Sequence, residues 1–539
     1  MTEALLRPLL AAGATGTIVA PEVGRLLAAT LPETLLTAGL VGLLLADAFG
    51  RLPKRVTPRI SLAVICLTAL VVAAGLSVPV QGTEPDHFFW RIFAGIGKAL
   101  GQEPTTVVGP LVVDTMARLF RLLFLAAAAY TIAFGMRRED PYVEQVEFQV
   151  LLLASLAGMS ILSAATDLLT AYLAFETVSY TGYLMVGYRK GERASSEAGL
   201  KYVIFGAASS GALLFGLSLL FGLAGSTSME AVARVLHETG PSPAAVAAAV
   251  LVFAGVAFKI SAVPFHFWAP DAYSGATTAV AGFLAVASKA AGFAVAIRIL
   301  GTWCGGADAV SEGTSFAFLP TGPLPCWIAA AGAVATMVVG NTAALRQTEM
   351  KRLLAWSSVA HAGYLLMALS MGTGDAIGAV LFYFWVYMLM TLGGFGIVGL
   401  LRKHLGGTEI RHYAGLARRN PTLAVAPTVL MVSLTGLPPT MGFWGKVLLF
   451  MPVIQAKYYG LALVGLLMSA VSLFYYAFLL RAMFLSEPAE GSDGPVTLET
   501  SDWLLVGIST VPLLAGGIFG WTPAAQALLE GAKHWIGAQ

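Results

Sequence analysis

Four lysines of this chain lie inside long apolar stretches, where a charged side chain is costly. They are Lys201, Lys259, Lys289 and Lys446. Glu176, in DLLTAYLAFETVSY, is the one carboxylate well inside such a stretch, and His361, in SSVAHAGYLL, adds a group that titrates near neutral pH. A charge near the centre of a bilayer costs about 2.5 to 3.5 kcal/mol, so these residues need a partner, a water-filled cavity or a function.

Lys259 and Glu176 are the candidate pair for carrying a proton. An amine in a dry environment releases its proton more readily than in water, and a nearby carboxylate opposes that release. A lysine whose carboxylate partner approaches and withdraws can therefore be switched between holding and releasing a proton. The alternative for Lys259 is a structural ion pair with a carboxylate on a neighbouring helix.

Prolines interrupt two of the apolar stretches close to these lysines. Pro264 follows Lys259 in FKISAVPFH, and Pro438 and Pro439 precede Lys446 in SLTGLPPTMGFWGKVLLF. Proline removes an amide donor and frees a carbonyl one turn earlier, and in hydrocarbon these groups must be met by water or protein. We therefore predict a broken helix with a wet interior at each place. For Pro264 the alternative is a simple kink near the membrane surface.

The remaining candidates have simpler alternatives. Lys289 lies midway through an unbroken helix of small residues and could bridge the two broken helices. His361 either takes part in proton transfer or is hydrogen-bonded within the bundle, and Lys201 either takes part or extends to the membrane surface. An aromatic belt at the interface is expected to contain Trp268 together with Phe265 and Phe267. Three acidic residues are expected at membrane edges as loop or cap residues: Asp167, Glu197 and Asp271.

The composition is that of a polytopic membrane protein. Of 539 residues, 57% are hydrophobic and 12% are charged, and the mean hydropathy is +0.78. The net charge of +2 indicates no nucleic-acid partner, since such a partner normally demands a basic surface. Cys66, Cys304 and Cys326 are widely separated and form no Cys/His cluster, so we expect neither a disulfide framework nor a metal centre, and any redox chemistry on another chain.

The fold class follows from the length of the apolar windows. A helix needs about 20 apolar residues to cross a bilayer, and such windows recur along nearly the whole chain. We predict an all-α protein with about fourteen transmembrane helices. The spans are 31–49, 60–80, 113–135, 147–166, 168–188, 198–223, 243–267, 276–300, 325–346, 352–371, 375–400, 421–452, 459–485 and 501–521. A further helix within residues 1–30 would make fifteen.

The basic loop residues predict the orientation. Alternate loops are rich in Lys and Arg, for example at residues 51–59, 189–193, 346–352 and 402–419, and such loops tend to stay in the cytoplasm. Both chain termini are therefore expected on the outer, periplasmic face. An even number of spans agrees with this placement.

The two interrupted stretches lie five helices apart, which suggests internal repeats. Interrupted apolar segments in corresponding positions of two halves are typical of transporters built in this way. We predict one repeat in residues 141–300 (spans 4–8) and a second in residues 325–485 (spans 9–13), with one copy inverted because the number of helices is odd. Residues 1–140 would form three N-terminal helices, and residues 501–539 a last span and a tail.

Four stretches resemble a known family. The segments SSEAGLKYVIFGAASSGALLFG, FKISAVPFHFWAPDAYSGATTAVAGFLAVASKAAGF, MKRLLAWSSVAHAGYLLMAL and LTGLPPTMGFWGKVLLF are similar to the N subunit (chain 2) of bacterial complex I, the proton-pumping NADH:quinone oxidoreductase. The similarity runs from about residue 140 to the C-terminus. This antiporter-like membrane subunit family implies fourteen helices with two inverted five-helix repeats and broken helices at spans 7 and 12.

The resemblance also implies which residues move protons. Carried over position by position, they are Glu176, Lys201, Lys259, Lys289, His361 and Lys446. The related M subunit carries a glutamate at the position of Lys446, and the L subunit continues into a long lateral helix, so the N type fits best. One departure is APDAYSGATTAV, where the family has TPDVYEGAPTPV; the loss of Glu and Pro puts loop contacts in doubt.

The implied function is that of a proton-translocating, non-redox subunit in a bacterial inner membrane. NADH, FMN, iron-sulfur clusters and quinone would bind other subunits, and this chain would hold no cofactor or metal. Its neighbours would be the M-type antiporter-like subunit, the small K-, J- and A-type subunits, and lipid. The alternatives are a stand-alone Mrp-like cation/proton antiporter and a structural membrane subunit without its own proton path.

Overall fold

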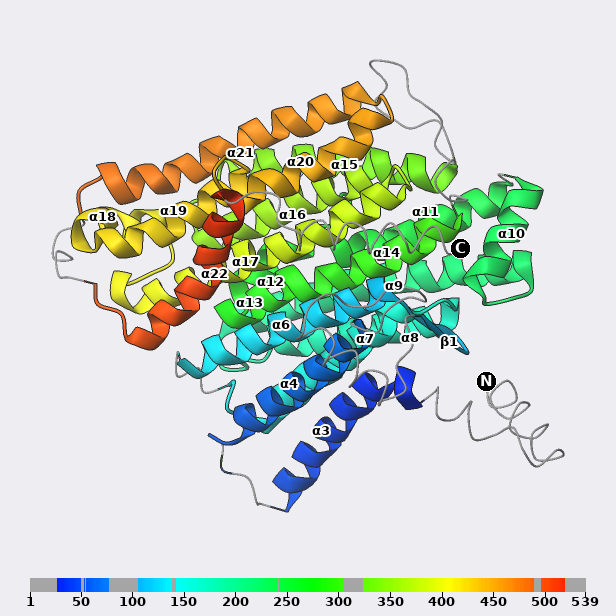
Figure 1. Cartoon of the computed structure of the whole chain (residues 1–539), viewed down its shortest axis with the longest axis horizontal. Coiled ribbons are helices and arrows are strands. Elements are labelled where there is room, and N and C mark those ends of the chain that lie inside the picture. The colour runs from blue at the N-terminus through cyan, green and yellow to red at the C-terminus, as the bar shows by residue number, and fades with distance from the viewer. Residues whose placement is uncertain are drawn as a thin grey trace, which may run out of the picture.

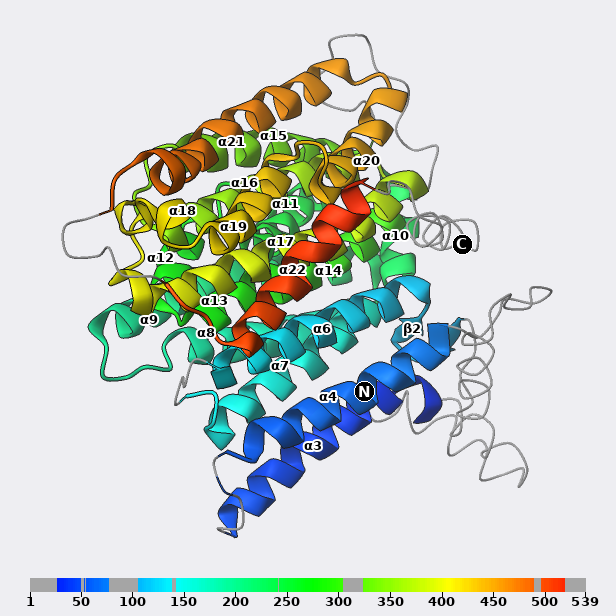
Figure 2. The ribbon, with the colours of Figure 1, turned by 60° about the vertical axis from the view of Figure 1, so that its left-hand side comes forward.

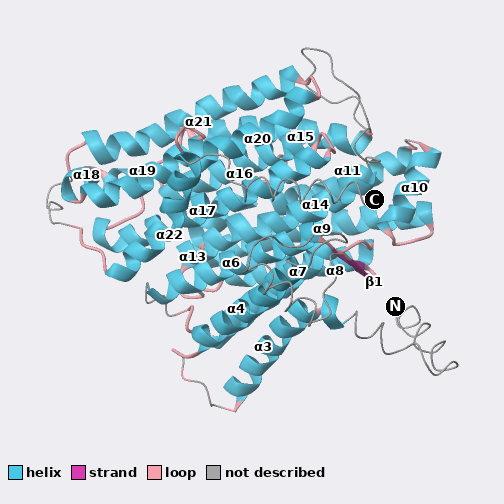
Figure 3. Ribbon diagram, viewed as in Figure 1, coloured by secondary structure: helices cyan, strands magenta, loops and turns pink. Residues whose placement is uncertain are grey.

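The computed structural model describes residues 27–49, 53, 55–76, 105–137, 142–240, 242–303, 323–488 and 496–518. Within this part the chain is almost wholly helical, and its one sheet is an antiparallel hairpin of β1 (Thr106–Val108) and β2 (Leu111–Val113) (Figure 3). The long helices lie side by side in one bundle (Figure 1). This agrees with the predicted all-α class.

Helix is the natural conformation for these segments because a helix satisfies its backbone amides within the segment, as hydrocarbon demands. The first half contains α3 (Leu31–Ala48), α4 (Thr57–Leu76), α6 (Thr115–Arg137), α7 (Val146–Ala164), α8 (Leu168–Val186), α9 (Arg193–Ala224), α10 (Met229–Thr239), α11 (Pro243–Ile260), α12 (Trp268–Gly275), α13 (Thr278–Phe283), the π-helical turn η1 (Leu284–Ser288) and α14 (Lys289–Trp303). The second half contains α15 (Leu324–Ala344), α16 (Met350–Leu369), α17 (Gly374–Leu405), the 3₁₀ turn η2 (Ile410–Tyr413), α18 (Leu416–Arg419), α19 (Pro421–Thr435), α20 (Met441–Gln455), α21 (Tyr459–Leu485) and α22 (Thr500–Ile518).

Eleven helical segments of the described chain are long and apolar enough to cross a membrane, so this is a multi-pass membrane protein. Helices also overlap the other predicted spans, but α8 and α16 fall outside the eleven, and α19 and α20 are each short. The count of fourteen spans therefore stays a prediction. The possible extra helix in residues 1–30 lies almost wholly outside the described residues.

Two apolar segments are interrupted by short non-helical stretches. Residues 261–267 separate α11 from α12, and residues 436–440 separate α19 from α20. The first residue of each stretch turns the chain out of the helix in a left-handed conformation, with φ of 60° at Ser261 and 83° at Gly436. The three prolines of the sequence prediction lie in these stretches: Pro264, Pro438 and Pro439.

The bundle buries its central helices and exposes apolar side chains at its edge. Residues 279–300, which span most of α13, η1 and α14, are all buried, and most of α17 is buried as well. α17 packs against α6, α16, α20 and α22 (Figure 2). The outer helices α3, α9 and α21 instead expose large apolar side chains such as Leu45, Phe215 and Leu466, as expected of a surface that meets lipid or another chain.

The expectation for the cysteines is wrong in one respect. Cys326, in the first turn of α15, is disulfide-bonded, whereas Cys66 is a free, exposed thiol. A disulfide depends on the distance between two Cα atoms in the fold, not on their spacing along the chain. Cys304 lies outside the described residues.

Candidate functional site

Lys259 lies in the last turn of α11, directly before the first interruption, and is only 1% exposed. Its Nζ donates to Ser179 Oγ of α8 at 3.0 Å. The amine also lies 5.2 Å from the centre of the Phe175 ring, one turn earlier on α8. Its described polar partner is therefore a neutral hydroxyl, and no carboxylate of the described residues lies within ion-pair distance of it.

Glu176 lies on α8, one turn before Ser179, and its carboxylate accepts a hydrogen bond from Ser210 of α9. It does not form the direct ion pair with Lys259 that the sequence suggested, although the two groups interact electrostatically. Ser179 contacts Lys259 from the same helix that carries Glu176. The two predicted partners thus lie on neighbouring helices, and the group that contacts the Lys259 amine is the hydroxyl of Ser179, not the carboxylate of Glu176.

Protein groups satisfy polar backbone atoms at the first interruption. Trp268, the first residue of α12, is 1% exposed and donates from Nε1 to the carbonyl oxygen of Phe258 at 2.9 Å. The amide of Val263 donates to Thr336 Oγ1 at 2.9 Å. The prediction of an interfacial belt for Trp268 is therefore wrong: its indole is buried because it stacks on Tyr202, with ring centres 4.2 Å apart.

Lys289 begins α14 and is 1% exposed. Its Nζ donates to the carbonyl oxygen of Ser358 at 2.7 Å and also to the Ser358 hydroxyl. The helix around it is continuous from Thr278 to Trp303, as expected, but it winds as the π-helical turn η1 directly before Lys289. Such turns recur at functional sites, where they change the direction of a side chain.

The side chain of Lys259 packs against α14 close to Lys289 in sequence. Gly292, one turn after Lys289, lies directly under the Lys259 side chain: a Cβ there would fall 3.0 Å from Lys259 Cγ and 3.1 Å from its Cβ. The absence of a side chain at Gly292 therefore allows the stem of Lys259 to pass close to α14.

His361 lies on α16, one turn after Ser358, and is buried. Its Nδ1 forms a hydrogen bond with the Tyr383 hydroxyl at 2.7 Å, and its ring packs against Tyr364 and Tyr387 with centres 5.8 and 5.4 Å away. The imidazole interacts electrostatically with both Lys289 and Lys446. Both lysines therefore lie within electrostatic range of the imidazole, whose hydrogen bond is to Tyr383.

Lys446 lies in α20, just after the second interruption, and is 5% exposed. Its Nζ donates to the carbonyl oxygen of Thr435 at 2.7 Å and to Ser469 Oγ of α21 at 2.8 Å. The amine lies 4.9 Å from the centre of the Tyr364 ring. A cavity of about 490 Å³ between α20 and α21 has Lys446 and Ser469 in its otherwise mostly apolar lining.

Lys201 lies apart from this row of groups. Its side chain is 41% exposed and forms ion pairs at 2.9 Å with both Glu197 and Asp271. Asp271 also binds Arg352 at 3.1 Å. The sequence suggested only a loop or cap role for Asp271, since nothing in its immediate neighbours shows that two cations from distant segments meet there.

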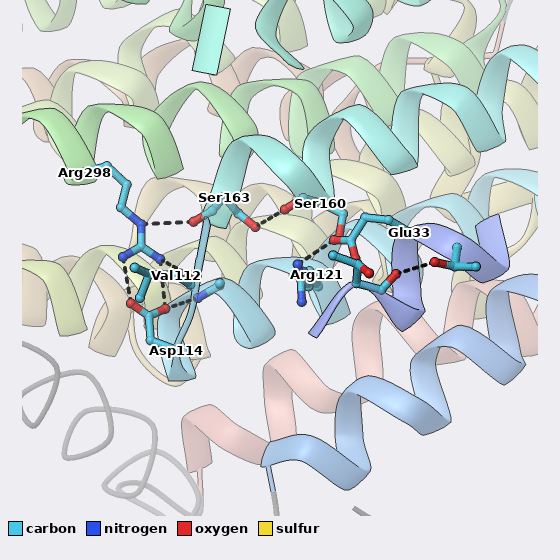
Figure 4. A network of polar contacts seen from close by, with 10 residues as sticks. Glu33, Val112, Asp114, Arg121, Ser160, Ser163 and Arg298 are labelled. Atoms are coloured by element: carbon cyan, nitrogen blue, oxygen red, sulfur yellow. Dashed lines mark hydrogen bonds and ion pairs between the residues drawn. The ribbon is translucent and has the colours of Figure 1, made fainter. Parts of the chain in front are cut away.

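A second set of buried charges escaped the sequence prediction (Figure 4). Arg298 of α14 donates to both carboxylate oxygens of Asp114 at 2.7 and 2.9 Å, and both side chains are almost fully buried. Arg121 of α6 pairs with Glu33 of α3, which also accepts from Ser160 of α7. Glu33 and Asp114 are buried although they lie at the ends of predicted spans, whereas Glu176, well inside its span, is only partly buried. Both arginines fall within predicted spans, which is the signal that could have identified them.

The buried lysines of this site are hydrogen-bonded to oxygen atoms of serines and of the backbone. In the described part of the chain no group of three or more His, Cys, Asp or Glu residues could hold a metal. Lys259, Lys289 and Lys446 each donate to serine hydroxyls, and the last two also to backbone carbonyls. A hydroxyl can accept from a charged amine or donate to a neutral one.

Comparison with known proteins gives consistent matches. A family model described as NADH:quinone oxidoreductase/Mrp antiporter, transmembrane, matches residues 165–472. NADH-quinone oxidoreductase subunit N from Anaeromyxobacter sp. is 42% identical over 437 residues, which cover 78% of this chain and 83% of that protein. The subunit N of Moorella thermoacetica is 39% identical over 486 residues, with 88% and 98% covered.

Solved structures show the same architecture. A chain of respiratory complex I from Thermus thermophilus is 30% identical and superposes with a TM-score of 0.71, covering 92% of this chain and 98% of that one. A chain of the Mrp complex from Dietzia sp. is 20% identical, with a TM-score of 0.74 and coverages of 94% and 96%. At that identity the second similarity shows the fold alone.

Proposed function

This chain belongs to the NADH:quinone oxidoreductase/Mrp antiporter family and, within it, to the N (subunit 2) chains, and from that premise we propose that it is a proton-translocating membrane subunit of a respiratory NADH:quinone oxidoreductase. NADH, FMN, iron-sulfur clusters and quinone bind other subunits, whose redox chemistry provides the energy. Its membrane partners are the M-type and the small K-, J- and A-type subunits.

The bonding of the three buried lysines is the observation that carries this proposal. Lys259, Lys289 and Lys446 are bonded to hydroxyl and carbonyl oxygens, and no described carboxylate lies within ion-pair distance of them. A purely structural charge in a membrane would be expected to pair with an opposite charge. Neutral acceptors instead stabilise the ammonium only moderately, so the amine can lose its proton without leaving a buried counter-charge behind.

The proton path follows the order of these groups. An electrostatic signal from a neighbouring subunit alters the interaction of Glu176 with Lys259, and Lys259 releases its proton toward Lys289. His361 links Lys289 to Lys446, from which the proton leaves on the outer face. Moving one charge against 100 mV takes about 2.3 kcal/mol, so the signal must change proton affinity by well over tenfold. Lys201, at the exposed rim, would act at the entrance rather than within this row.

The fold supports the two proposed repeats, residues 141–300 and 325–485, flanked by the N-terminal helices and the last span. Each repeat holds one interrupted segment with a buried lysine beside the interruption. The disulfide-bonded Cys326 supports the proposed orientation, because it begins α15 at the face expected to be periplasmic, and disulfides persist there but are rare in the cytoplasm. Both termini are then periplasmic, in an inner membrane.

Replacement of Lys259 tests the proposal. In the complete complex reconstituted in vesicles, Lys259→Ala should leave assembly intact and lower the number of protons moved per electron pair. If Lys259 served only to hold helices together, assembly would fall while the complexes that form would pump normally. That outcome would refute the role of this residue as a proton carrier.

A stand-alone cation/proton antiporter is the second candidate, favoured by the shared fold with the Mrp complex chain. Purified chain in proteoliposomes distinguishes the two. Exchange of Na⁺ for H⁺ by the isolated chain at a high rate would favour the antiporter; no exchange without partner subunits supports the complex I role.

A further inference from the structure

The short helix α12 is held at its N-terminal end by an aspartate that binds two cations. Asp271 lies in its first turn, and its Oδ2 binds Lys201 of α9 at 2.9 Å, while its Oδ1 binds Arg352 of α16 at 3.1 Å. These groups are partly exposed, so each pair alone is weak. One carboxylate nevertheless joins three helices.

The C-terminal end of α12 is held by two further cations. Arg189 Nη2 donates to the carbonyl oxygen of Gly275 at 2.9 Å. Lys351 Nζ donates to the carbonyl oxygen of Ala276, also at 2.9 Å, and to the carbonyl oxygen of Ser274. Both cations are at least nine-tenths buried. Cations favour the C-terminal end of a helix because its last carbonyls carry a partial negative charge, and charge-assisted hydrogen bonds are the strong ones.

These four cations come from both proposed repeats. Arg189 precedes α9 and Lys201 lies in it, whereas Lys351 and Arg352 begin α16. The departure from the family motif also finds its explanation here. Ser274 stands where the family has a glutamate, and its hydroxyl donates to Glu349 at 3.1 Å, so a carboxylate from the second repeat lies at this place.

The position of α12 is linked directly to Lys259. Trp268, at the start of α12, donates to the carbonyl oxygen of Phe258, the residue before Lys259. The Trp268 ring also packs on Phe258, with centres 5.3 Å apart, and on Tyr202 of α9. A displacement of α12 would therefore move the backbone that carries the Lys259 side chain.

We propose that Arg189, Lys201, Lys351 and Arg352 form an ionic clamp on α12 and are positioning residues for Lys259. The inference rests on the proposed function, because it assigns the clamp a role in proton transfer at Lys259. The clamp fixes the second half of the interrupted helix, and Trp268 transmits its position to the lysine. Its members belong to both proposed repeats, so a movement of one repeat against the other alters the site of Lys259.

The test uses the complete complex in vesicles and compares Lys351→Met, which keeps the apolar stem but removes the donors, with Lys351→Arg, which keeps them. Arg234→Met is the matched control, because Arg234 forms an exposed ion pair with Glu230 on α10, far from the clamp in sequence. Two quantities are measured: protons moved per electron pair, and hydrogen exchange of the amides of residues 261–275.

Lys351→Met should speed hydrogen exchange of this segment by about tenfold, as expected for loss of a charged hydrogen bond, and lower the proton-to-electron ratio at least about twofold. Lys351→Arg should restore both quantities, and Arg234→Met should change neither. Unchanged exchange in Lys351→Met, or faster exchange with normal pumping, would overturn the proposal.

If the Lys351→Met variant fails to assemble, Trp268→Phe provides a second test of the proposal. It retains an aromatic ring against Tyr202 but removes the donor to Phe258, and should lower pumping while α12 stays in place. Normal pumping in Trp268→Phe would overturn the link to Lys259. Lys259→Ala in the same assay separates the two hypotheses. If Lys259→Ala fails to pump while the clamp variants pump normally, only the clamp proposal is refuted. If Lys259→Ala itself pumps normally, the proposed function is refuted.

Discussion

Gly292→Ala should disturb proton transfer by moving Lys259 without changing any ionisable group. A Cβ at position 292 would fall 2.8 Å from Ile260 Cγ2 and 3.0 Å from Lys259 Cγ. Ordinary contact between carbons requires about 3.5 Å, so α11 must move away from α14 by roughly half an ångström. The two atoms that give way belong to the last residues of α11, next to the interruption.

The cost in stability should be small and the cost in pumping large. Alanine favours a helix interior over glycine by about 1 kcal/mol, and overpacking costs about 1 to 3 kcal/mol, so the net change in the free energy of unfolding is about 0 to 2 kcal/mol. Misplacement of a reacting group by about 1 Å can cost a hundredfold in rate, so a half-ångström shift should lower the rate of proton movement on the order of tenfold.

The assay is the number of protons moved per electron pair by the complete complex in vesicles, with the rate of quinone reduction measured in the same sample. Gly211→Ala is the matched control, because it adds the same methyl group to a helical position of α9 where nothing lies within 4 Å. Gly292→Ala should pump poorly and Gly211→Ala normally. Normal pumping by Gly292→Ala, with the chain assembled, would refute the importance of the position of Lys259.

Two further predictions concern the buried charges and the second interruption. Asp114→Ala removes the carboxylate that neutralises buried Arg298, so it should destabilise the protein by about 3 to 5 kcal/mol and lower its midpoint of thermal unfolding. Glu230→Ala, in an exposed ion pair, should cost under about 1 kcal/mol. Equal effects of the two variants would contradict the burial argument. Gly436→Ala places a Cβ 2.5 Å from Lys446 Cδ at a residue with φ of 83°, so pumping should fall with the complex assembled; a fully active variant would show that Lys446 need not hold this position.

Much of the fold could be predicted because a bilayer imposes strict limits on length and hydropathy. Most of the long helices lie within a few residues of the predicted spans, and the Gly and Pro residues of 433–450 coincide with an interruption; α10, between two predicted spans, was not predicted, and α11 ends seven residues early. The order of the helices in space could not be predicted in this way, since apolar helices of similar composition can pack in many arrangements. The π-helical turn before Lys289 has no sequence signature of its own.

Of the site, only the charged residues inside apolar segments could be predicted from the sequence. Lys259, Lys289 and Lys446 stand out because a buried cation is expensive, and the structure buries all three. Their acceptors Ser179 and Ser358 could not be predicted, because a serine costs little in a helix and many are present.

The ion pairs that Asp271 of α12 forms with other helices could not be predicted for a different reason. Asp271 resembles an ordinary residue near a helix start, and only the fold brings Lys201 and Arg352 to it. Local sequence carries no information on contacts between such distant segments.

The most direct test of the account is whether the surroundings of the Glu176 carboxylate change during turnover as Lys259 passes on its proton. Infrared difference spectra of the reconstituted complex, recorded with and without NADH, report this as a carboxyl band. The account predicts a band that vanishes in Glu176→Gln and changes in Lys259→Met, while Glu230→Gln leaves it unaltered. A spectrum with no band assignable to Glu176, in a complex that pumps at full rate, would contradict the central claim.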